Sequence, residues 1–486
     1  MNTAFDVSES VLPAQHRADV VVVGAGISGL VAAYRLLQNG VVPLVVEASG
    51  SAGGFLAPLH VTDAAGEVHE FDAGAESFST RSSIVWDLVT ELGLETVKPS
   101  PAGAWCFPSV GQPFPLPKAG VLGIPSEWDS PDLLEVLGAE GVERGRADEW
   151  MNTSVGDRSN LAAFVASRMG HQVVDKLVGP IAGGVHSTTP DKLDVTAIHP
   201  NFWKIFEEAG SLSGAVARIR AAAPAGSGVL GIKGGLHRII SALVERISAG
   251  GGRFMYNCAV TSLARVDDEW RINIDPAEGV ASQLATSRVV LATPAQAALG
   301  LLESCDIVSA DEVQQAPAGT DISLVTLVVD CADLARTPSR GTGALIAPGG
   351  AIRAKGSTHA NVKWQWIADD LAHGSFGANP HVIRFSYGRH GDQSVPSRDE
   401  LDAFARRDFE LIYGPFEPDA FEIVQVHTVL WPAALPPVTP QLKALSAQVV
   451  ARVKDLPGCV ITGSWISGTG LAATIPHADS VIKEIL

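Results

Sequence analysis

The chain has 486 residues, of which 46% are apolar and 18% charged, and its 53 acidic residues outnumber its 35 basic ones to give a net charge of -18. The apolar content excludes an intrinsically disordered protein, and the length predicts at least two domains. The negative charge repels phosphate backbones and anionic lipid headgroups, so nucleic acid is not an expected partner and an anionic substrate would need a local cationic pocket.

Signals for metal binding, export or membrane insertion are missing from the sequence. The five cysteines are scattered, and neither they nor the 13 histidines have the spacing of metal ligands. The first residues, up to Asp19, carry acids and no long apolar core, and the apolar run from Val20 to Tyr34 is too short to cross a bilayer. We therefore expect a cytoplasmic protein without a metal ion or a transmembrane segment, and peripheral membrane contact stays open.

The chain opens with the pattern of a βαβ unit. Asp19 to Val23 predicts a buried strand, Ile27 to Gln38 a helix, and Val42 to Glu47 a second strand. The turn between the first strand and the helix reads Gly24-Ala25-Gly26-Ile27-Ser28-Gly29. Its first glycine allows a tight turn, its second lets the backbone approach a pyrophosphate, and its third allows close packing of helix on strand, while the helix N-terminus stabilises the anion.

Two further features select the nucleotide. Glu47 ends the second strand, where an acid accepts hydrogen bonds from ribose hydroxyls and disfavours a 2′-phosphate, so FAD or NAD is preferred over NADP. The chain then continues with a glycine pair before Phe55 and with Phe71-Asp72-Ala73-Gly74-Ala75-Glu76-Ser77. A glycine pair at this point lets a loop wrap an extended dinucleotide, which favours FAD over NAD.

The remaining patterns divide the chain into three predicted units. Helical spacing dominates Pro131 to Ala223, while apolar strands recur at Asp321 to Asp330 and His381 to Tyr387. Near the C-terminus a strand, Cys459 to Thr462, leads through glycines into a last helix. We expect a discontinuous FAD-binding domain of residues 1–97, 226–300 and 456–486, a helical insertion of residues 98–225, and a mixed α/β substrate domain of residues 301–455.

Several more motifs follow one another along nearly the whole chain: Gly179 to Val185, Pro190 to Leu193, Lys233 to Leu236, Ala354 to Trp364, Gly388-Arg389, Trp431 to Pro436 and Gly463 to Leu471. Together with the glycine turn, this ordered set resembles the FAD-containing amine-oxidase superfamily and, within it, the protoporphyrinogen/coproporphyrinogen oxidase family. The resemblance implies an α/β flavoprotein with two dinucleotide-binding domains, a Rossmann-type FAD domain among them, carrying a mixed α/β substrate domain and a helical insertion.

The resemblance also implies where FAD would lie. The pyrophosphate would be held at Gly24 to Gly29, and the last helix's N-terminus at the flavin's pyrimidine edge would stabilise the negative charge of the reduced ring. The implied cofactor-binding residues are Gly24, Ala25, Gly26, Ile27, Ser28 and Gly29 for the pyrophosphate, Glu47 and Ala48 for the ribose, Val260 for the adenine, Gly54, Phe55, Gly74, Ala75, Glu76, Ser77 and Trp431 for the flavin side, and Thr469, Gly470 and Leu471 for the pyrimidine edge.

The chain departs from the family pattern at three places. Phe55 stands where the wider superfamily often has arginine, which puts a pyrophosphate contact by that side chain in doubt. The usual Ala-Leu-Pro-Gln-Tyr reads Ala434 to Val438, and the usual Gly-Val-Gly-Leu-Pro reads Gly468 to Ala472. These two changes leave the expected FAD binding intact, but they put in doubt the substrate contacts that the family pattern would imply.

The implied reaction is the oxygen-dependent oxidation of a porphyrinogen in heme biosynthesis. Hydride would pass from a bridging carbon to FAD, and O2 would reoxidise the flavin to give H2O2. No catalytic side chain is expected, because the pyrrole nitrogens supply the electron push and the protein positions the ring. Arg81 and Lys363 are the candidate ligands for the substrate's propionates, although a single arginine or lysine is more often a solvated surface charge.

The alternatives lie in the substrate and in the class of protein. Coproporphyrinogen III is favoured over protoporphyrinogen IX only because a chain rich in alanine, glycine and arginine fits a GC-rich actinobacterium. An amine or amino-acid oxidase would account for the cofactor segments but not for Pro180 to Gly184 or Lys363-Trp364. A non-enzymatic escort protein would lack the yellow flavin, and contact with another heme-pathway enzyme stays open.

Overall fold

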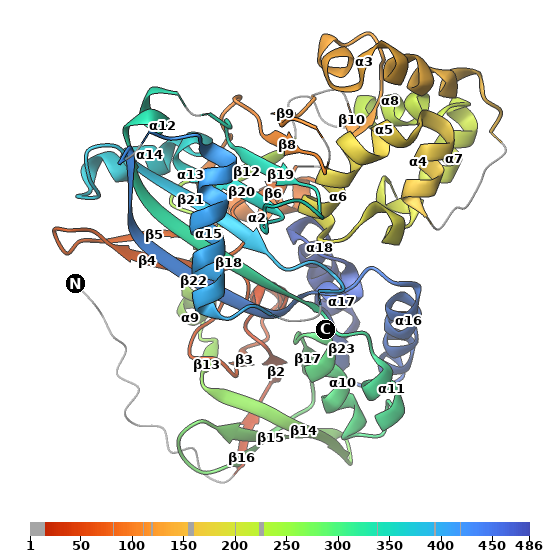
Figure 1. Cartoon of the computed structure of the whole chain (residues 1–486). Helices are drawn as coiled ribbons and strands as arrows, with labels where there is room; N and C mark the ends of the chain where they lie inside the picture. Colours follow the sequence, from red (N-terminus) through yellow and green to blue (C-terminus); the bar gives the residue numbers. More distant parts are fainter. Residues whose placement is uncertain are drawn as a thin grey trace.

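The computed structural model describes residues 15–80, 82–109, 111–117, 120–153, 160–199, 201–222, 228–337, 339–392, 395–417 and 419–486. In Figure 1 a parallel sheet lies in the lower part of the molecule, a large and mostly antiparallel sheet lies above it, and a group of helices lies beside the large sheet. The fold is a mixed α/β architecture with several sheets.

A five-stranded parallel sheet is the centre of the lower part. Four of its five strands are uninterrupted apolar runs, because their side chains are buried on both faces of the sheet. Alternate residues contribute to two separate apolar clusters, one on each face: Val22 packs into the first and Val21 into the second. The strand order is β13 (Arg253–Met255), β3 (Pro43–Val46), β2 (Val20–Val23), β17 (Val289–Leu291) and β23 (Cys459–Ile461).

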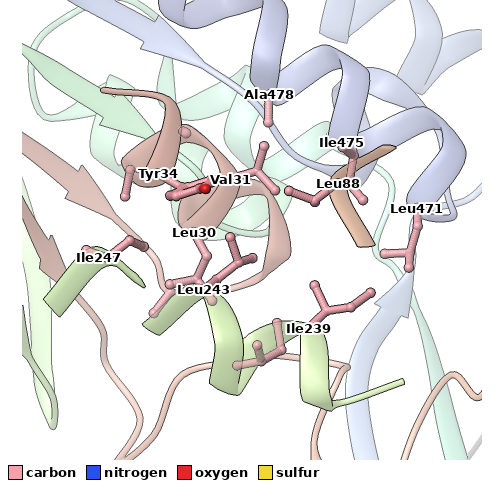
Figure 2. Packing of buried hydrophobic residues seen from close by; sticks show 14 of the residues in the cluster. Leu30, Val31, Tyr34, Leu88, Ile239, Leu243, Ile247, Leu471, Ile475 and Ala478 are labelled. Carbon is pink, nitrogen blue, oxygen red and sulfur yellow. The ribbon is translucent and has the colours of Figure 1, made fainter. Parts of the chain in front are cut away.

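Four helices from distant parts of the chain cover the first face of this sheet. Figure 2 shows Leu30 and Val31 packing against Leu88, Leu243 and Ile475. These side chains belong to α1 (Ile27–Gln38), α2 (Ser83–Glu91), α9 (Arg238–Ala249) and α18 (Leu471–Val481). The first helix after the opening glycine turn and the last helix of the chain therefore lie side by side.

The second face packs against helices and a mostly antiparallel sheet. Trp270 is 1% exposed and lies in the cluster between this sheet and the parallel one. The strand order is β1 (Gln15–Ala18), β16 (Ser282–Thr286), β15 (Glu269–Pro276) and β14 (Cys258–Val266), and all pairs are antiparallel except the parallel pair of β1 and β16. The helices on this side are α10 (Ala295–Glu303), α11 (Ala310–Gln315) and α16 (Pro440–Lys454).

The upper sheet has seven strands and two differently covered faces. Helix α15 (Arg398–Tyr413) packs Leu401, Ala405 and Phe409 on one face. The opposite face meets the helical segment and the loops of the parallel sheet. The strand order is β22 (Phe421–Leu435), β18 (Thr320–Cys331), β21 (Pro380–Tyr387), β20 (Gly356–His359), β19 (Gly343–Ile346), β8 (Trp105–Phe107) and β9 (Phe114–Pro115).

The helical segment has an apolar core of its own. Phe164, Phe202 and Phe206 lie within ring-contact distance of one another and are at most 1% exposed. The helices are α3 (Pro131–Arg146), α4 (Leu161–Met169), α5 (His171–Val173), α6 (Gly179–His186), α7 (Phe202–Ala209) and α8 (Leu212–Ala222), with short turns at Ala147–Trp150, Val174–Val178, Pro190–Lys192 and Val195–Ala197.

The remaining elements are short. They are β4 (Pro58–Thr62), β5 (Val68–Asp72), β6 (Phe78–Ser79), β7 (Thr96–Val97), β10 (Gly120–Val121), β11 (Ile124–Pro125), β12 (Val229–Ile232), α12 (Ala332–Arg336), α13 (Ala360–Lys363), α14 (Gln365–His373), α17 (Ser464–Ser467) and a turn at Ile482–Glu484. Within the described ranges, none of the helices combines the length and apolarity needed to span a bilayer.

The fold class expected from the sequence is confirmed. The predicted helix Ile27 to Gln38 has the bounds of α1. The segment 98–225, expected to be a helical insertion, also supplies β8 and β9 to the seven-stranded sheet, because Ala344 to Ile346 pair with Trp105 to Phe107. The three domain boundaries themselves stay a prediction.

Candidate cofactor and substrate site

The opening glycine turn has the geometry of an anion site. Gly24 has φ +101°, and a Cβ on Gly29 would lie 1.9 Å from the carbonyl oxygen of Gly24, so neither position accepts a side chain. A Cβ on Gly26, in contrast, would meet nothing within 4 Å. The N-terminus of α1 has no side-chain cap and no acid in its first turn. Its free amide groups and open space fit a phosphate group.

The acid at the end of β3 lies directly beside this turn. Glu47 Oε2 accepts a hydrogen bond from the backbone amide of Ala25 at 2.7 Å, and Oε1 accepts from Ser49 at 2.8 Å. The carbonyl oxygen of Glu47 accepts from Cys258 N, which places Val260 two residues beyond this contact on β14. Ala48 is exposed next to the acid. The ribose and adenine candidates are thus neighbours.

The closing glycine turn resembles the opening one. Gly463, Gly468 and Gly470 have φ of +137°, +91° and +94°. A Cβ on Gly470 would meet nothing within 4 Å, and α18, which follows, has no side-chain cap and no acid in its first turn. Thr469 is exposed, whereas Leu471 is buried in the cluster that also holds Leu30 of α1. Two uncapped helix N-termini therefore belong to one packed unit.

A third group of residues joins the glycine turns to the seven-stranded sheet. A Cβ on Gly54 would lie 3.6 Å from the Cα of Gly26, and a Cβ on Gly74 would lie 2.0 Å from the carbonyl oxygen of Phe55. The ring of Phe55 is 37% exposed and meets Trp431 of β22 edge to face, with 5.6 Å between centroids. Trp431 Nε1 donates to the carbonyl oxygen of Ala73 at 3.0 Å. Glycine is needed here so that the loops can approach closely.

A cluster of charges lies next to these loops. Glu76 Oε1 pairs with Lys363 Nζ at 2.5 Å, and Oε2 pairs with Arg384 Nη2 at 3.0 Å. Arg384 also donates to the carbonyl oxygens of Asp72 and Gly74 at 2.9 and 2.8 Å. We call Glu76, Lys363 and Arg384 the Glu76 cluster. It ties the loop at 72–76 to β21 and α13.

The Glu76 cluster carries one more positive charge than negative. Burial alone would raise the pKa of Glu76, but the nearby charges of Lys363 and Arg384 outweigh it and lower the pKa to about 2. The carboxylate is therefore ionised at neutral pH. A cavity of about 20 Å³ behind the cluster, lined by Phe71 and Trp364 among others, has room for about one water molecule.

The structure brings most of the residues singled out in the sequence to one region. Lys363, expected as a free cation for the substrate, is paired with Glu76 and lies over the Trp364 ring. Ala75 is exposed and Ser77 half-buried on the loop around Glu76. Arg81, the other expected substrate ligand, lies outside the described residues.

Sequence reasoning missed two residues that position this loop. Arg384 interrupts the apolar strand His381 to Tyr387, and a charge within such a run was the available signal. Asp72 accepts hydrogen bonds from the backbone amides of Leu236 and His237 at 3.0 Å and so caps the start of α9. Nothing in the sequence indicated that partner, 165 residues away.

The residues fit the cofactor that the sequence predicts. Space for backbone approach exists at Gly26 and Gly470, and each glycine precedes an uncapped helix N-terminus. Glu47 provides a ribose acceptor beside the first, and the Phe55 and Trp431 rings provide an apolar wall near the loop at 72–76. A dinucleotide joining the two ends needs all of these features. FAD is accordingly the cofactor of this fold.

Comparison with known proteins agrees with this geometry. The model of the family described as flavin containing amine oxidoreductase matches residues 27–478. Among curated proteins, "Coproporphyrinogen III oxidase" of Mycobacterium leprae is 29% identical over 96% of this chain and 97% of its own length. The protein of the same name from Staphylococcus aureus is 24% identical over 96% and 98%. "Protoporphyrinogen oxidase, chloroplastic" of Nicotiana tabacum is 22% identical over 96% and 85%.

Solved structures show the same fold. A protein of Exiguobacterium sp. 255-15, provisionally named a protoporphyrinogen oxidase, has a TM-score of 0.79 at 23% identity and covers 97% of this chain and 98% of its own. Putrescine oxidase with bound putrescine has a TM-score of 0.64 at 16% identity, covering 97% and 99%. At these identities the likeness concerns the fold alone.

Proposed function

Since the chain belongs to the flavin containing amine oxidoreductase family, we propose that it oxidises coproporphyrinogen III to coproporphyrin III, with O2 as the final electron acceptor. The observation that carries the proposal is the excess positive charge of the Glu76 cluster beside the cofactor loops. An excess cation attracts a propionate and repels the ammonium group of an amine substrate. The names of the bacterial relatives point to the same substrate.

Bound FAD would supply the two-electron acceptor, used three times to aromatise one macrocycle and returned to its oxidised state by O2 with release of H2O2. The residues proposed to hold it are the amides at Gly24 to Gly29, Glu47 and Ala48 at the ribose, Val260 at the adenine, Gly54, Phe55, Gly74 to Ser77 and Trp431 on the flavin side, and Thr469 to Leu471 at the pyrimidine edge.

The protein's own part would be positioning and exclusion of water. No side chain is proposed as a catalytic base, because the pyrrole nitrogens provide the electrons that expel the hydride. The edge-to-face pair of Phe55 and Trp431 offers an apolar wall for a flat macrocycle. Lys363 would act through the net charge of the Glu76 cluster, and Arg81 stays a candidate ligand for a second propionate. Holding the reacting carbon in place is the main source of rate here.

A cytoplasmic reaction, free or in contact with another heme-pathway enzyme, is the proposed setting. All five cysteines are free, at Cys106, Cys258, Cys305, Cys331 and Cys459. Burial raises the pKa of Cys106 and of Cys459 to about 12, so neither is a reactive thiolate. Free, scattered cysteines are typical of a reducing compartment.

The test is an aerobic assay of the purified yellow protein with coproporphyrinogen III, protoporphyrinogen IX and putrescine. Porphyrin fluorescence and H2O2 are followed together, and three H2O2 per coproporphyrin are expected. A higher kcat/KM for protoporphyrinogen IX would transfer the proposal to the substrate named for the tobacco relative. Turnover of putrescine without turnover of either porphyrinogen would refute it.

A further inference from the structure

A second group of cations lies where the helical segment meets the seven-stranded sheet, outside the Glu76 cluster. Lys355 directly precedes β20 and is 4% exposed. Its Nζ donates to Ser187 Oγ at 2.5 Å. Over the described part of the chain, that neutral hydroxyl is its one hydrogen-bond partner and no carboxylate forms an ion pair with it. Lys355 is therefore a buried cation whose charge the protein leaves without a counter-ion.

Arg389 adds a second positive charge at the same place. It follows β21, whose Ser386 carbonyl accepts the backbone amide of Lys355 at 2.8 Å. Among the described residues, the buried Nε of Arg389 has no hydrogen-bond partner. The other guanidinium nitrogens donate there to the backbone carbonyl oxygens of Arg353, Ile346 and Ala354 and to no side chain. These neutral acceptors satisfy donors but do not cancel the charge.

The charges of two carboxylates, Asp392 and the buried Asp408, act on Arg389, but neither forms an ion pair with Arg389 or Lys355 in the described part of the chain. Asp392 accepts the backbone amide of Arg389 at 2.7 Å but is exposed, and Lys192 lies on the other side, 3.2 Å from where a Cβ on Gly391 would be. Burial, and then the charge of Arg389, lower the pKa of Lys355 to about 7, while Asp392 acts in the opposite direction. A buried charge of this kind is costly to keep unless an anion joins it.

Lys355 lies on the same face of the sheet as the Glu76 cluster. Ala354 packs with Leu401 under α15, and Ser357 Oγ is hydrogen-bonded to Tyr413 of α15 at 3.0 Å, so these two residues face that helix. Lys355 instead reaches Ser187 in the helical segment, which covers the opposite face. Thr358 also faces away from α15 and donates to Glu76 Oε1 at 3.4 Å.

The separation of the two cation groups suits one large substrate. Thr358 lies on β20 and Lys355 comes directly before that strand, so their Cα atoms are three residues and at most about 10 Å apart, at 3.3 Å per residue. That is the scale on which the bridging carbons and the propionates of one tetrapyrrole are separated. A ring held near the Glu76 cluster could therefore extend a carboxylate toward Lys355.

We propose that Lys355, supported by the charge of Arg389, binds a propionate carboxylate of the substrate at the junction of the helical segment and the sheet. The ammonium group would donate to the carboxylate while keeping its bond to Ser187. This inference rests on the proposed function, because it names the part of that substrate that the junction recognises. It makes Lys355 a binding residue and Ser187 a positioning residue.

The test measures binding without turnover. Dissociation constants for coproporphyrin III and for its uncharged tetramethyl ester are obtained by fluorescence quenching with the FAD-loaded native protein and with Lys355→Met. Loss of a charge-assisted hydrogen bond predicts that the variant binds the tetra-acid about ten- to a hundredfold more weakly. The ester should bind both proteins equally, and Lys355→Arg should restore much of the affinity for the acid.

Two controls separate binding from folding. Lys176→Met removes a half-buried lysine whose Nζ donates to the Val136 carbonyl at 2.8 Å, and it should leave both dissociation constants unchanged. Lys355→Met should keep its FAD and unfold at the same or a higher temperature, because an unpaired buried charge has been removed. Weakened binding together with a lower unfolding temperature and loss of FAD would instead indicate a structural lysine.

The outcomes also separate this inference from the proposed function. Equal affinity of native protein and Lys355→Met for the tetra-acid would overturn it, and so would an equal loss of affinity for acid and ester. A native protein that binds coproporphyrin III through Lys355 yet fails to oxidise the porphyrinogen would overturn the proposed reaction and leave the binding site supported.

Discussion

The helical segment and the cofactor region each contain a buried charge cluster, and the two clusters are balanced differently. In the helical segment, Asp148 is 0% and Arg168 3% exposed, and they form a one-to-one ion pair. The second carboxylate oxygen accepts from the Ser213 amide at 2.8 Å, and Arg168 donates to the Asn152 carbonyl at 2.9 Å. Each charge of this pair therefore has its counter-ion within the segment.

The Glu76 cluster has two cations for one carboxylate, whereas Lys355 and Arg389 form no ion pair with a carboxylate in the described part of the chain. Folding alone favours the balanced arrangement, because an uncompensated buried charge costs free energy. We infer that the balanced pair stabilises the helical segment, and we propose that the unbalanced clusters bind an anion. The predictions below test that distinction by removing one charge at a time.

The largest effect is expected for Asp148→Ala. It leaves Arg168 buried without a counter-ion, which should lower the free energy of unfolding by about 3–5 kcal/mol. Urea unfolding at pH 7, followed by tryptophan fluorescence, measures the change. The double variant Asp148→Leu/Arg168→Met should recover most of the loss, and the folded fraction of either variant should keep the native kcat/KM. A change in kcat/KM would show that the Asp148–Arg168 pair also contributes to the cofactor and substrate site.

The next effect is that of Glu76→Gln, and it should depend on pH. The folded-state pKa of Glu76 is about 2, below the ordinary value of about 4.5, so its contribution to stability is complete above pH 4.5 and is lost as the pH falls through 2. A shift of this size corresponds to about 3 kcal/mol at pH 7. Unfolding of native protein and variant, compared from pH 7 down to pH 3, should show a difference that shrinks with acid; a constant difference would contradict the ion-pair account.

A smaller effect is expected for Arg384→Lys, which keeps the charge but loses the fork whose Nη1 donates to two carbonyl oxygens while its Nη2 pairs with Glu76. Loss of the hydrogen bonds to the carbonyl oxygens of Asp72 and Gly74 should destabilise the native position of the loop at 72–76 by about 2 kcal/mol. Retention of FAD during dialysis is the measurement, and weaker retention is expected. Arg271→Lys, which alters a pair with Glu269 on β15, is the matched control and should retain FAD as the native protein does.

The smallest effect is expected at an ion pair on the surface. Glu312 pairs with Arg452 at 2.8 Å, and the side chains are 27% and 40% exposed. Hydrogen bonds from Arg452 lower the pKa of Glu312 to about 2, as for Glu76, but solvent screens this pair. Glu312→Gln keeps the capping box with Ser309, so its cost should stay below about 1 kcal/mol. If Glu312→Gln lowered the free energy of unfolding as much as Glu76→Gln does, burial would not explain how strongly an ion pair stabilises this protein.

The sequence predicted the local elements and the cofactor better than it predicted the substrate side. The turn at Gly24 to Gly29 and the helix that follows it are determined by neighbouring residues, so their pattern is readable. The strand β22 was missed because Pro432 and mixed polar residues obscure its alternation over Phe421 to Leu435. The short strands β8 and β9 were hidden in a stretch rich in proline and glycine.

Pairings between distant residues were beyond the reach of sequence reasoning. Lys363 was recognised as a candidate cation, but its partner Glu76 lies 287 residues away in the chain. Lys355 and Ser187 are 168 residues apart, and each is ordinary within its own segment. Which charges meet, and which stay without a counter-ion, is decided by how the helical segment packs on the sheet. The function of such a residue becomes visible only in the folded chain.

The central claim, that a porphyrinogen delivers its hydrogens to FAD held between the two glycine turns, is tested most directly without oxygen. Purified yellow protein is mixed anaerobically with coproporphyrinogen III in a stopped-flow instrument, and absorbance near 450 nm, the usual flavin band, is followed. The account predicts bleaching as porphyrin fluorescence rises, and recovery of the colour when O2 is admitted. Porphyrin formation with unchanged flavin absorbance, or no reaction at all, would contradict it.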